Sequence, residues 1–276
     1  MMGKSHSLSG AALGLTSVGV YSVVTHTVPD PILTVMWTVV FAGASLIADH
    51  DSWGSTANRS FGVLGRVIYW IVNALGLVVY NTTKTAKDED KNNGHRTFLH
   101  TTVAAILAGG LTALATLSTG DALTILGKTY TWGSLFGLLI FAYCLNLAVA
   151  GLFSKQIKKA KTGLGVYVLM AGSVGVTLLV SRFLPESIQN YSWLGLAVGL
   201  GYFVHLLGDG ITKMGVPFVW PMKVRSYRWY NLGSPHFMRF TAGGEFEQVF
   251  LVRLFIAAIF VAGIWDALLA FKILPV

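Results

Sequence analysis

The sequence has little charge and almost no cysteine. Charged residues make up 12% of its 276 residues, about half of the fraction that a soluble domain carries. This scarcity excludes an ordinary soluble domain, and the single cysteine, Cys144, excludes an internal disulfide. Apolar residues are abundant instead, because 54% of the chain is hydrophobic and the mean hydropathy is +0.63. We therefore expect an all-α, polytopic integral membrane helical bundle that forms a single membrane domain over residues 1–276.

Eight apolar runs are long enough to cross a bilayer. They lie at about 8–26, 30–48, 62–80, 99–118, 134–153, 163–183, 191–210 and 249–271. The first run follows a single lysine, as in a signal peptide, but it has no convincing cleavage site, so we interpret it as a retained helix. The chain holds 31 glycines, and the pairs Gly10/Gly14 and Gly195/Gly199 have the spacing that lets membrane helices approach closely.

Polar residues that can bind a metal ion gather at the ends of these runs. They are His6, Asp49, Asp51, His95, His100, His205, Asp209 and one of Glu245 or Glu247. His205 and Asp209 are four residues apart, so both side chains leave the same face of a helix. Asp49 and Asp51 can converge only where a helix has ended. We expect His95 to precede a helix and His100 to lie one turn inside it. Separate structural hydrogen bonds are the alternative interpretation of these clusters.

The number of crossings decides whether the clusters share one face of the membrane. Seven crossings gather every cluster on the face where the chain begins, whereas eight divide them. The run at 62–80 carries Arg66 and Asn73, which suit an interfacial or re-entrant helix better than a lipid-exposed crossing. With seven crossings, 17 of the 20 Lys and Arg residues also lie on the shared face. The positive-inside rule makes this face cytoplasmic. We therefore expect about seven transmembrane helices, one interfacial or re-entrant helix and a site on the cytoplasmic side.

Two loops are explained without a metal site. Residues 81–94 have no apolar content and predict a mobile loop whose charges are only solvated. Residues 220–240 alternate aromatic and basic side chains, a pattern that also occurs in proteins that bind nucleic acids. In a membrane protein the pattern favours a belt at the level of the lipid headgroups. We therefore expect membrane lipids as partners and no nucleic acid.

Five motifs occur in a fixed order along the chain. They are Gly3 to His6, Leu46 to Asp51, His95 to His100, residues 202–221 with their Gly-Val-Pro-Phe-Val-Trp-Pro ending, and Gly243 to Glu247. In combination and order they resemble the YdjM-like family of LexA-regulated inner-membrane proteins, which are described as metal-dependent hydrolases. The resemblance implies a multi-pass protein of the inner membrane. It places the metal-site motifs in 1–110 and 195–250 and makes 119–190 a segment of inserted helices.

The chain departs from the family pattern at one motif. The family's acidic pair is usually preceded by Pro and followed by His, where this chain has Ala48 and Ser52. His50 either replaces that histidine or caps the end of a helix. The family pattern also has an acidic residue before the last apolar run. The position of Glu247 relative to that run favours it over Glu245 as this residue.

The donor types suit one or two divalent ions, with zinc first and manganese or another divalent ion as alternatives. Such an ion activates water and polarises the scissile bond, with Asp51 or Asp209 as general base and Glu247 as a further catalytic acid implied by the resemblance. Arg96 either neutralises developing negative charge or anchors a helix end to lipid headgroups. The basic and aromatic rim indicates an amphiphilic, phosphate-bearing or ester substrate.

Two other functions compete with a hydrolase. A membrane transporter or metal-ion carrier has polar residues near mid-membrane along a path, whereas here they lie at the ends of the runs. A non-catalytic protein with a structural metal clamp has a closed site. An open coordination position beside the metal separates an enzyme from a clamp.

Overall fold

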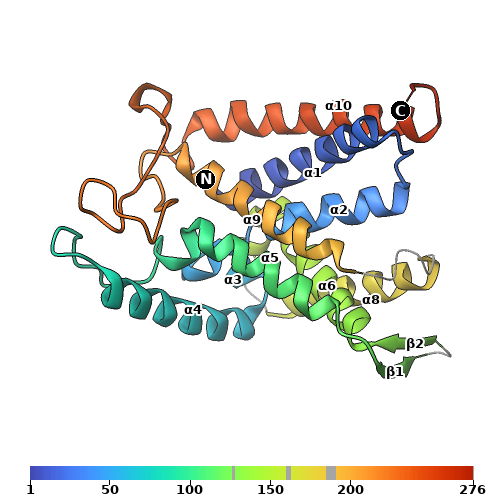
Figure 1. Ribbon diagram of the computed structural model, residues 1–276, viewed down its shortest axis with the longest axis horizontal. Coiled ribbons are helices and arrows are strands. Elements are labelled where there is room, and N and C mark those ends of the chain that lie inside the picture. The colour runs from blue at the N-terminus through green and yellow to red at the C-terminus, as the bar shows by residue number, and fades with distance from the viewer. Residues whose placement is uncertain (126–127, 160–162, 185–190, 276) are drawn as a thin grey trace.

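The computed structural model describes residues 1–125, 128–159, 163–184 and 191–275. Each apolar run of the sequence overlaps one long helix, so the chain is an all-α membrane bundle, as predicted (Figure 1). The long helices are α1 (Gly3–Thr25), α2 (Pro31–Ala44), α4 (Gly62–Thr83), α5 (Thr102–Thr116), α6 (Trp132–Leu152), α8 (Leu164–Phe183), α9 (Trp193–Gly210) and α10 (Val252–Ala270).

Short elements that the sequence analysis did not predict join the long helices. They are the 3-10 turns η1 (Ala48–Asp51), η2 (Phe98–His100) and η4 (His236–Met238), the π-helical turn η5 (Phe246–Leu251), the helices α3 (Thr56–Arg59) and α7 (Ser154–Lys159), and the strands β1 (Asp121–Ile125) and β2 (Lys128–Thr131). The two strands pair antiparallel between α5 and α6, and η5 leads directly into α10. That residues 119–190 are an insertion stays a prediction, and parts of that segment lie outside the described residues.

Seven of the long helices run alternately away from and toward one end of the bundle, which we call the site end. The site end holds the start of α1 and the ends of α2 and α9 (Figure 1). Helix α6 also ends there, because Ser7 of α1 donates a hydrogen bond to the carbonyl of Ala148 at 3.2 Å. At the opposite end, Gly19 of α1 faces Asp266 of α10. These seven helices are α1, α2, α5, α6, α8, α9 and α10.

Helix α4 both begins and ends at the site end. Its first residue, Gly62, lies against Tyr167 in the first turn of α8. In its last turn, Thr83 accepts a hydrogen bond from the indole of Trp229, which belongs to the loop after α9. Its main packing partners are α3, η1 and η2. Among the described residues, six helical segments are long and apolar enough to cross a membrane, and α4 is one of them. That α4 is an interfacial or re-entrant helix stays a prediction, as does the number of crossings.

Glycines at the predicted spacing set the distance between helices at two contacts. A Cβ added to Gly10 of α1 would lie 2.6 Å from the carbonyl oxygen of Phe41 in α2. A Cβ added to Gly195 of α9 would lie 2.7 Å from the carbonyl oxygen of Gly109 in α5. Both approaches therefore require glycine. Cys144 lies fully buried in the apolar core that α2, α6 and α9 share. This packing brings the polar ends of α1, α2, α5 and α9 together.

The polar loop after α4 is attached to the rest of the protein. Asp88 accepts hydrogen bonds from the backbone N–H groups of Arg228 and Trp229 at 3.3 and 3.1 Å. The prediction that the charges of residues 81–94 are only solvated is therefore wrong for Asp88, because a distant loop presents its amides to this carboxylate. Trp229 is buried and stacks on Trp220. These two indoles pack against α4 and hold the loop. The headgroup belt predicted for residues 220–240 stays a prediction.

Candidate metal centre

The candidate ligands from four segments meet at the site end. The turn η1 follows the end of α2, so Asp49 and Asp51 lie on a tight turn, as the sequence analysis required. Thr101 caps α5 by accepting a hydrogen bond from the N–H of Ala104 at 3.1 Å. Helix α5 therefore begins only after His100, which ends the η2 turn. The expectation that His100 lies one turn inside a helix is wrong, because the threonine cap starts the helix two residues later.

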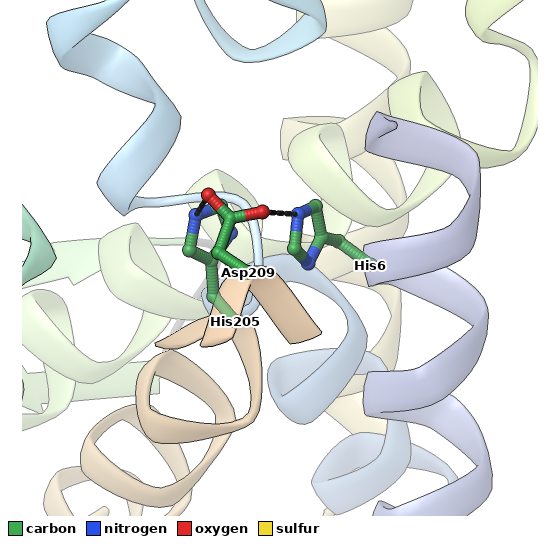
Figure 2. A group of neighbouring side chains, drawn as sticks. All are labelled: His6, His205 and Asp209. Atoms are coloured by element: carbon green, nitrogen blue, oxygen red, sulfur yellow. Dashed lines mark ion pairs between the residues drawn. The ribbon is translucent and has the colours of Figure 1, made fainter. Parts of the chain in front are cut away.

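Asp209 lies between His6 and His205. Figure 2 shows its carboxylate pointing toward both imidazoles, one from α1 and the other from its own helix, α9. Asp209 Oδ1 is 3.2 Å from His6 Nε2, and Asp209 Oδ2 is 3.7 Å from His205 Nε2. The two rings stack with their centroids 3.9 Å apart, and all three side chains are buried. Asp209 Oδ1 also contacts the amino group of Met1. Together His6, His205 and Asp209 can hold a metal ion.

Two imidazole nitrogens, His100 Nε2 and His205 Nε2, face each other at 3.2 Å. His205 Nδ1 lies 2.8 Å from the carbonyl oxygen of Ser45, which can only accept, so Nδ1 carries a proton and Nε2 carries a lone pair. His100 Nδ1 donates to Asp51 Oδ2 at 3.0 Å. Histidines that bind metals use the same pattern, with one ring nitrogen fixed by a carbonyl or carboxylate. Two lone pairs aimed at each other repel, so this gap needs a proton or a metal cation.

The separations around these nitrogens match a tetrahedral set of ligands. Asp209 Oδ2 lies 3.5 Å from His100 Nε2 and 3.7 Å from His205 Nε2. Ligands that surround zinc at about 2.0–2.1 Å are about 3.3 Å from one another in a tetrahedral site. Asp49 Oδ1 lies 3.9 Å from His205 Nε2, and Asp49, His100 and His205 form a third group that can hold a metal ion. The separations among His100, His205 and Asp209 are therefore close to those that a zinc-sized ion needs.

Asp51 is the centre of a second group. Its Oδ1 lies 2.7 Å from His95 Nδ1, and its Oδ2 accepts from His100 Nδ1 and from the backbone N–H of Arg96, both at 3.0 Å. Asp51, His95 and His100 also form a group that can hold a metal ion. Because both oxygens are engaged, Asp51 orients two imidazoles and fixes the segment that carries them. The side chain of His95 is 36% exposed, whereas that of His100 is fully buried.

The Arg96 side chain closes the cluster on the side of the loop that follows α9. Its Nη2 is 2.9 Å from Asp209 Oδ2, and its Nη1 donates to the carbonyl of Gly215 at 2.9 Å. Its Nε has no hydrogen-bond partner among the described residues. Arg96 is only 7% exposed, so the alternative in which it extends to the lipid headgroups is wrong. Its backbone has a φ of 54°, a strained conformation that the hydrogen bond to Asp51 helps to hold.

The carboxylates determine the protonation of His100, which lies outside α5. Burial alone lowers the pKa of His100, but the negative charges of Asp51 and Asp209 and their hydrogen bonds outweigh burial and raise this pKa to about 9. In the metal-free protein His100 therefore holds an additional proton at neutral pH. A cation that binds at Nε2 competes with this proton.

Glu247 lies apart from this cluster. It is buried, and its carboxylate accepts hydrogen bonds from the backbone N–H groups of Met2 at 2.6 Å and Gly243 at 2.7 Å. It therefore ties η5 to the start of α1. Glu245 is exposed, so Glu247 is the buried acid of the two. That Glu247 is the acid of the family's pattern stays a prediction, as does its catalytic role.

Two further polar residues have local explanations. The two ring nitrogens of His50 are each 2.7 Å from a neutral partner, Asn58 Oδ1 and the Tyr143 hydroxyl, so His50 stabilises the turn after α2. Asp266 lies in α10 against Gly19 of α1, away from the site end, and neither of its oxygens has a hydrogen-bond partner among the described residues. Neither residue joins the candidate metal centre.

A pocket of about 200 Å³ gives access to the cluster. Four members of the cluster, Asp49, His95, Arg96 and Asp209, line it. The rest of its wall comes from the start of α1 and from the turn between η1 and α3. The cluster is therefore buried but accessible from one side.

Comparisons with known proteins agree with this architecture. No curated protein and no solved structure matches the chain. The family described as YdjM inner membrane protein matches residues 1–268, a range that includes every residue of the cluster. Together with its apolar helices, this match makes the chain a multi-pass protein of the inner membrane. The chain belongs to the YdjM inner membrane protein family.

Proposed function

We propose that this protein is a metal-dependent hydrolase that cleaves a phosphoester or ester bond of an amphiphilic substrate, at a site facing the cytoplasm. The observation that carries the proposal is the pair of facing nitrogens, His100 Nε2 and His205 Nε2, 3.2 Å apart with Asp209 beside them. In the metal-free protein a proton on His100 fills this gap, and a divalent ion would take its place between the two nitrogens. A divalent ion, zinc or manganese, would supply Lewis-acid activation of water and of the scissile bond.

Four side chains would hold the ion: His100, His205, Asp49 and Asp209. The Ser45 carbonyl keeps the proton of His205 on Nδ1, and Asp51 does the same for His100. Both Nε2 atoms are thereby left as ligands. In this proposal Asp51 acts as a positioning residue, because its two oxygens already accept three hydrogen bonds.

His95 is the residue best placed to move a proton. It lines the pocket, its side chain is 36% exposed, and its Nδ1 is 2.7 Å from Asp51 Oδ1. A carboxylate at that position holds the imidazole in one tautomer and increases its basicity. His95 would therefore act as the base, and Asp51 would orient it. Arg96 lines the same pocket, and its positive charge would stabilise negative charge that develops on a phosphoester.

The test begins with metal analysis of the purified, full-length protein in detergent. We expect His100→Ala and His205→Ala to lose most of the bound metal, whereas His236→Ala, at an exposed imidazole in the loop after α9, retains it. Full metal content in both cluster variants would leave only structural hydrogen bonds as the explanation of the site.

The second step is a hydrolysis screen with a phosphomonoester, a phosphodiester and a carboxylic ester of p-nitrophenol, followed by phospholipids. We expect hydrolysis that is abolished by a chelator and restored by zinc or manganese. His95→Gln should keep the metal and lose at least about tenfold in turnover, as is usual for a lost acid–base group. Bound metal without hydrolysis of any of these substrates would favour a structural clamp.

A further inference from the structure

We propose that a second pocket at the site end binds a phosphate group, carried by the headgroup of an anionic lipid. This pocket has a volume of about 390 Å³ and lies between α3, the start of α4 and the start of α8. It is separate from the pocket at the metal centre, with which it shares only Gly54. No candidate metal ligand lines it, so the proposal does not depend on the proposed hydrolase activity.

The charges that face this pocket are all positive. Arg59, at the end of α3, and Arg66, in α4, line it, and none of the residues that line it is acidic. Both arginines are exposed, and neither forms an ion pair with another described residue. Two like charges around one cavity repel each other, and an anion between them offsets this repulsion. The planar fork of a guanidinium matches the oxygens of a phosphate.

The amino end of α8 adds to this positive potential. The cap residue of this 20-residue helix is Gly163, which has no side chain to accept from the free N–H groups of the first turn, and that turn carries no acidic residue. Gly163 and Tyr167 line the pocket. A helix start without such an acceptor attracts anions. The helix end and the two arginines therefore favour the same kind of ligand.

Aromatic side chains indicate that the phosphate belongs to a lipid. Trp53 and Tyr167 line the pocket and are 53% and 47% exposed. The Trp53 ring also contacts Tyr69 and Trp70 of α4, with centroids 5.0 and 6.0 Å apart. Exposed Trp and Tyr side chains prefer the headgroup level of a bilayer. Free phosphate offers the same chemistry without the attached lipid, so the two sources must be separated by experiment.

The experiment measures binding of dioleoyl phosphatidylglycerol to the purified protein in detergent, with phosphatidylcholine as the neutral lipid. The variant Arg59→Gln/Arg66→Gln removes both charges from the pocket. Its matched control, Lys213→Gln/Arg253→Gln, removes two exposed charges elsewhere at the site end. The metal content of each variant is measured in parallel, and we expect it to stay at the wild-type value. Arg59→Lys/Arg66→Lys keeps the charges but not the guanidinium forks.

We expect the affinity for phosphatidylglycerol to fall on the order of tenfold or more in the Gln double variant, because two charge-assisted contacts are lost. The control should bind like the wild type, and the Lys double variant should lie between them. Lipid binding that persists in millimolar inorganic phosphate supports an anionic lipid as the ligand. Full displacement by inorganic phosphate identifies free phosphate as the ligand and overturns the assignment to a lipid. Equal affinity of the Gln double variant and the wild type, or an equal loss in the control, would overturn the proposal.

Discussion

Replacing Asp51 with asparagine tests whether this carboxylate controls metal binding without touching the metal. Asp51 accepts hydrogen bonds from His95, from His100 and from the backbone of Arg96. An asparagine has one oxygen acceptor and one NH₂ donor, so it cannot satisfy three donors. If its NH₂ group faces His100 Nδ1, the ring must carry its proton on Nε2, where the metal binds. Asp51→Asn therefore favours the wrong tautomer of a ligand while leaving every ligand atom in place.

The expected size of this effect follows from the contact that is lost. A hydrogen bond between a carboxylate and an imidazole that binds metal contributes roughly 10- to 100-fold in metal affinity, or about 1.4–2.7 kcal/mol. A second effect opposes the first, because the charge of Asp51 also helps to raise the pKa of His100 to about 9. Without this charge the proton competes less with the metal at neutral pH. The loss of affinity should consequently be larger at pH 9 than at pH 7.

Competition between the protein and a chelator of known zinc affinity measures this loss at both pH values. The matched control is Asp266→Asn, because it makes the same substitution at a buried acid of α10 that lies away from the cluster. A zinc affinity of Asp51→Asn within twofold of the wild type at both pH values would refute the orienting role. An equal loss in Asp266→Asn would refute it as well, since the effect would then be a general one on the bundle.

Four further predictions concern protons, packing and topology. Because the metal displaces a proton from His100 below pH 9, its association constant should rise about tenfold per pH unit from pH 7 to 9 and then level off. In the metal-free protein, the raised pKa of His100 stabilises the fold, with its full contribution below pH 6.5. This contribution is lost as the pH rises through about 9, and thermal unfolding measured at several pH values tests the loss. Glu247→Gln, which leaves a backbone N–H without its acceptor, should cost about 1–3 kcal/mol of stability with unchanged metal content; an unchanged melting temperature would contradict this. A cysteine at Lys87 should react with a membrane-impermeant reagent only from the cytoplasm and one at Ser118 only from outside, and the opposite result for Lys87 would disprove the shared face.

The long helices were predictable because each depends on a local property of the chain, the length of an apolar run. The location of Asp49 and Asp51 on a turn after α2 was also predictable, since two aspartates in i, i+2 positions can serve one site only where the helix has ended. The short distance between His100 and His205 was not, because 105 positions separate them and only the packing of α5 on α9 sets it.

Two other features of the structure, one in the site and one in the loop after α4, have no signal in the sequence. The proton of His205 is fixed by a backbone carbonyl, that of Ser45, and any residue type offers the same carbonyl. The role of Asp88 depends on amides of a loop 140 residues away. Whether a charged residue in a polar loop is solvated or bonded therefore depends on tertiary structure, which composition does not reveal.

The ligands of the candidate centre also constrain how the protein is made. His6 enters the membrane with the first helix, whereas His205 and Asp209 arrive with α9, after five intervening long helices have been synthesised. Until α9 is in place, the early histidines and aspartates have neither the facing nitrogen nor the carboxylate that completes a coordination sphere. A metal ion captured by this set of residues would therefore report that the nascent chain has been assembled in the membrane as far as α9.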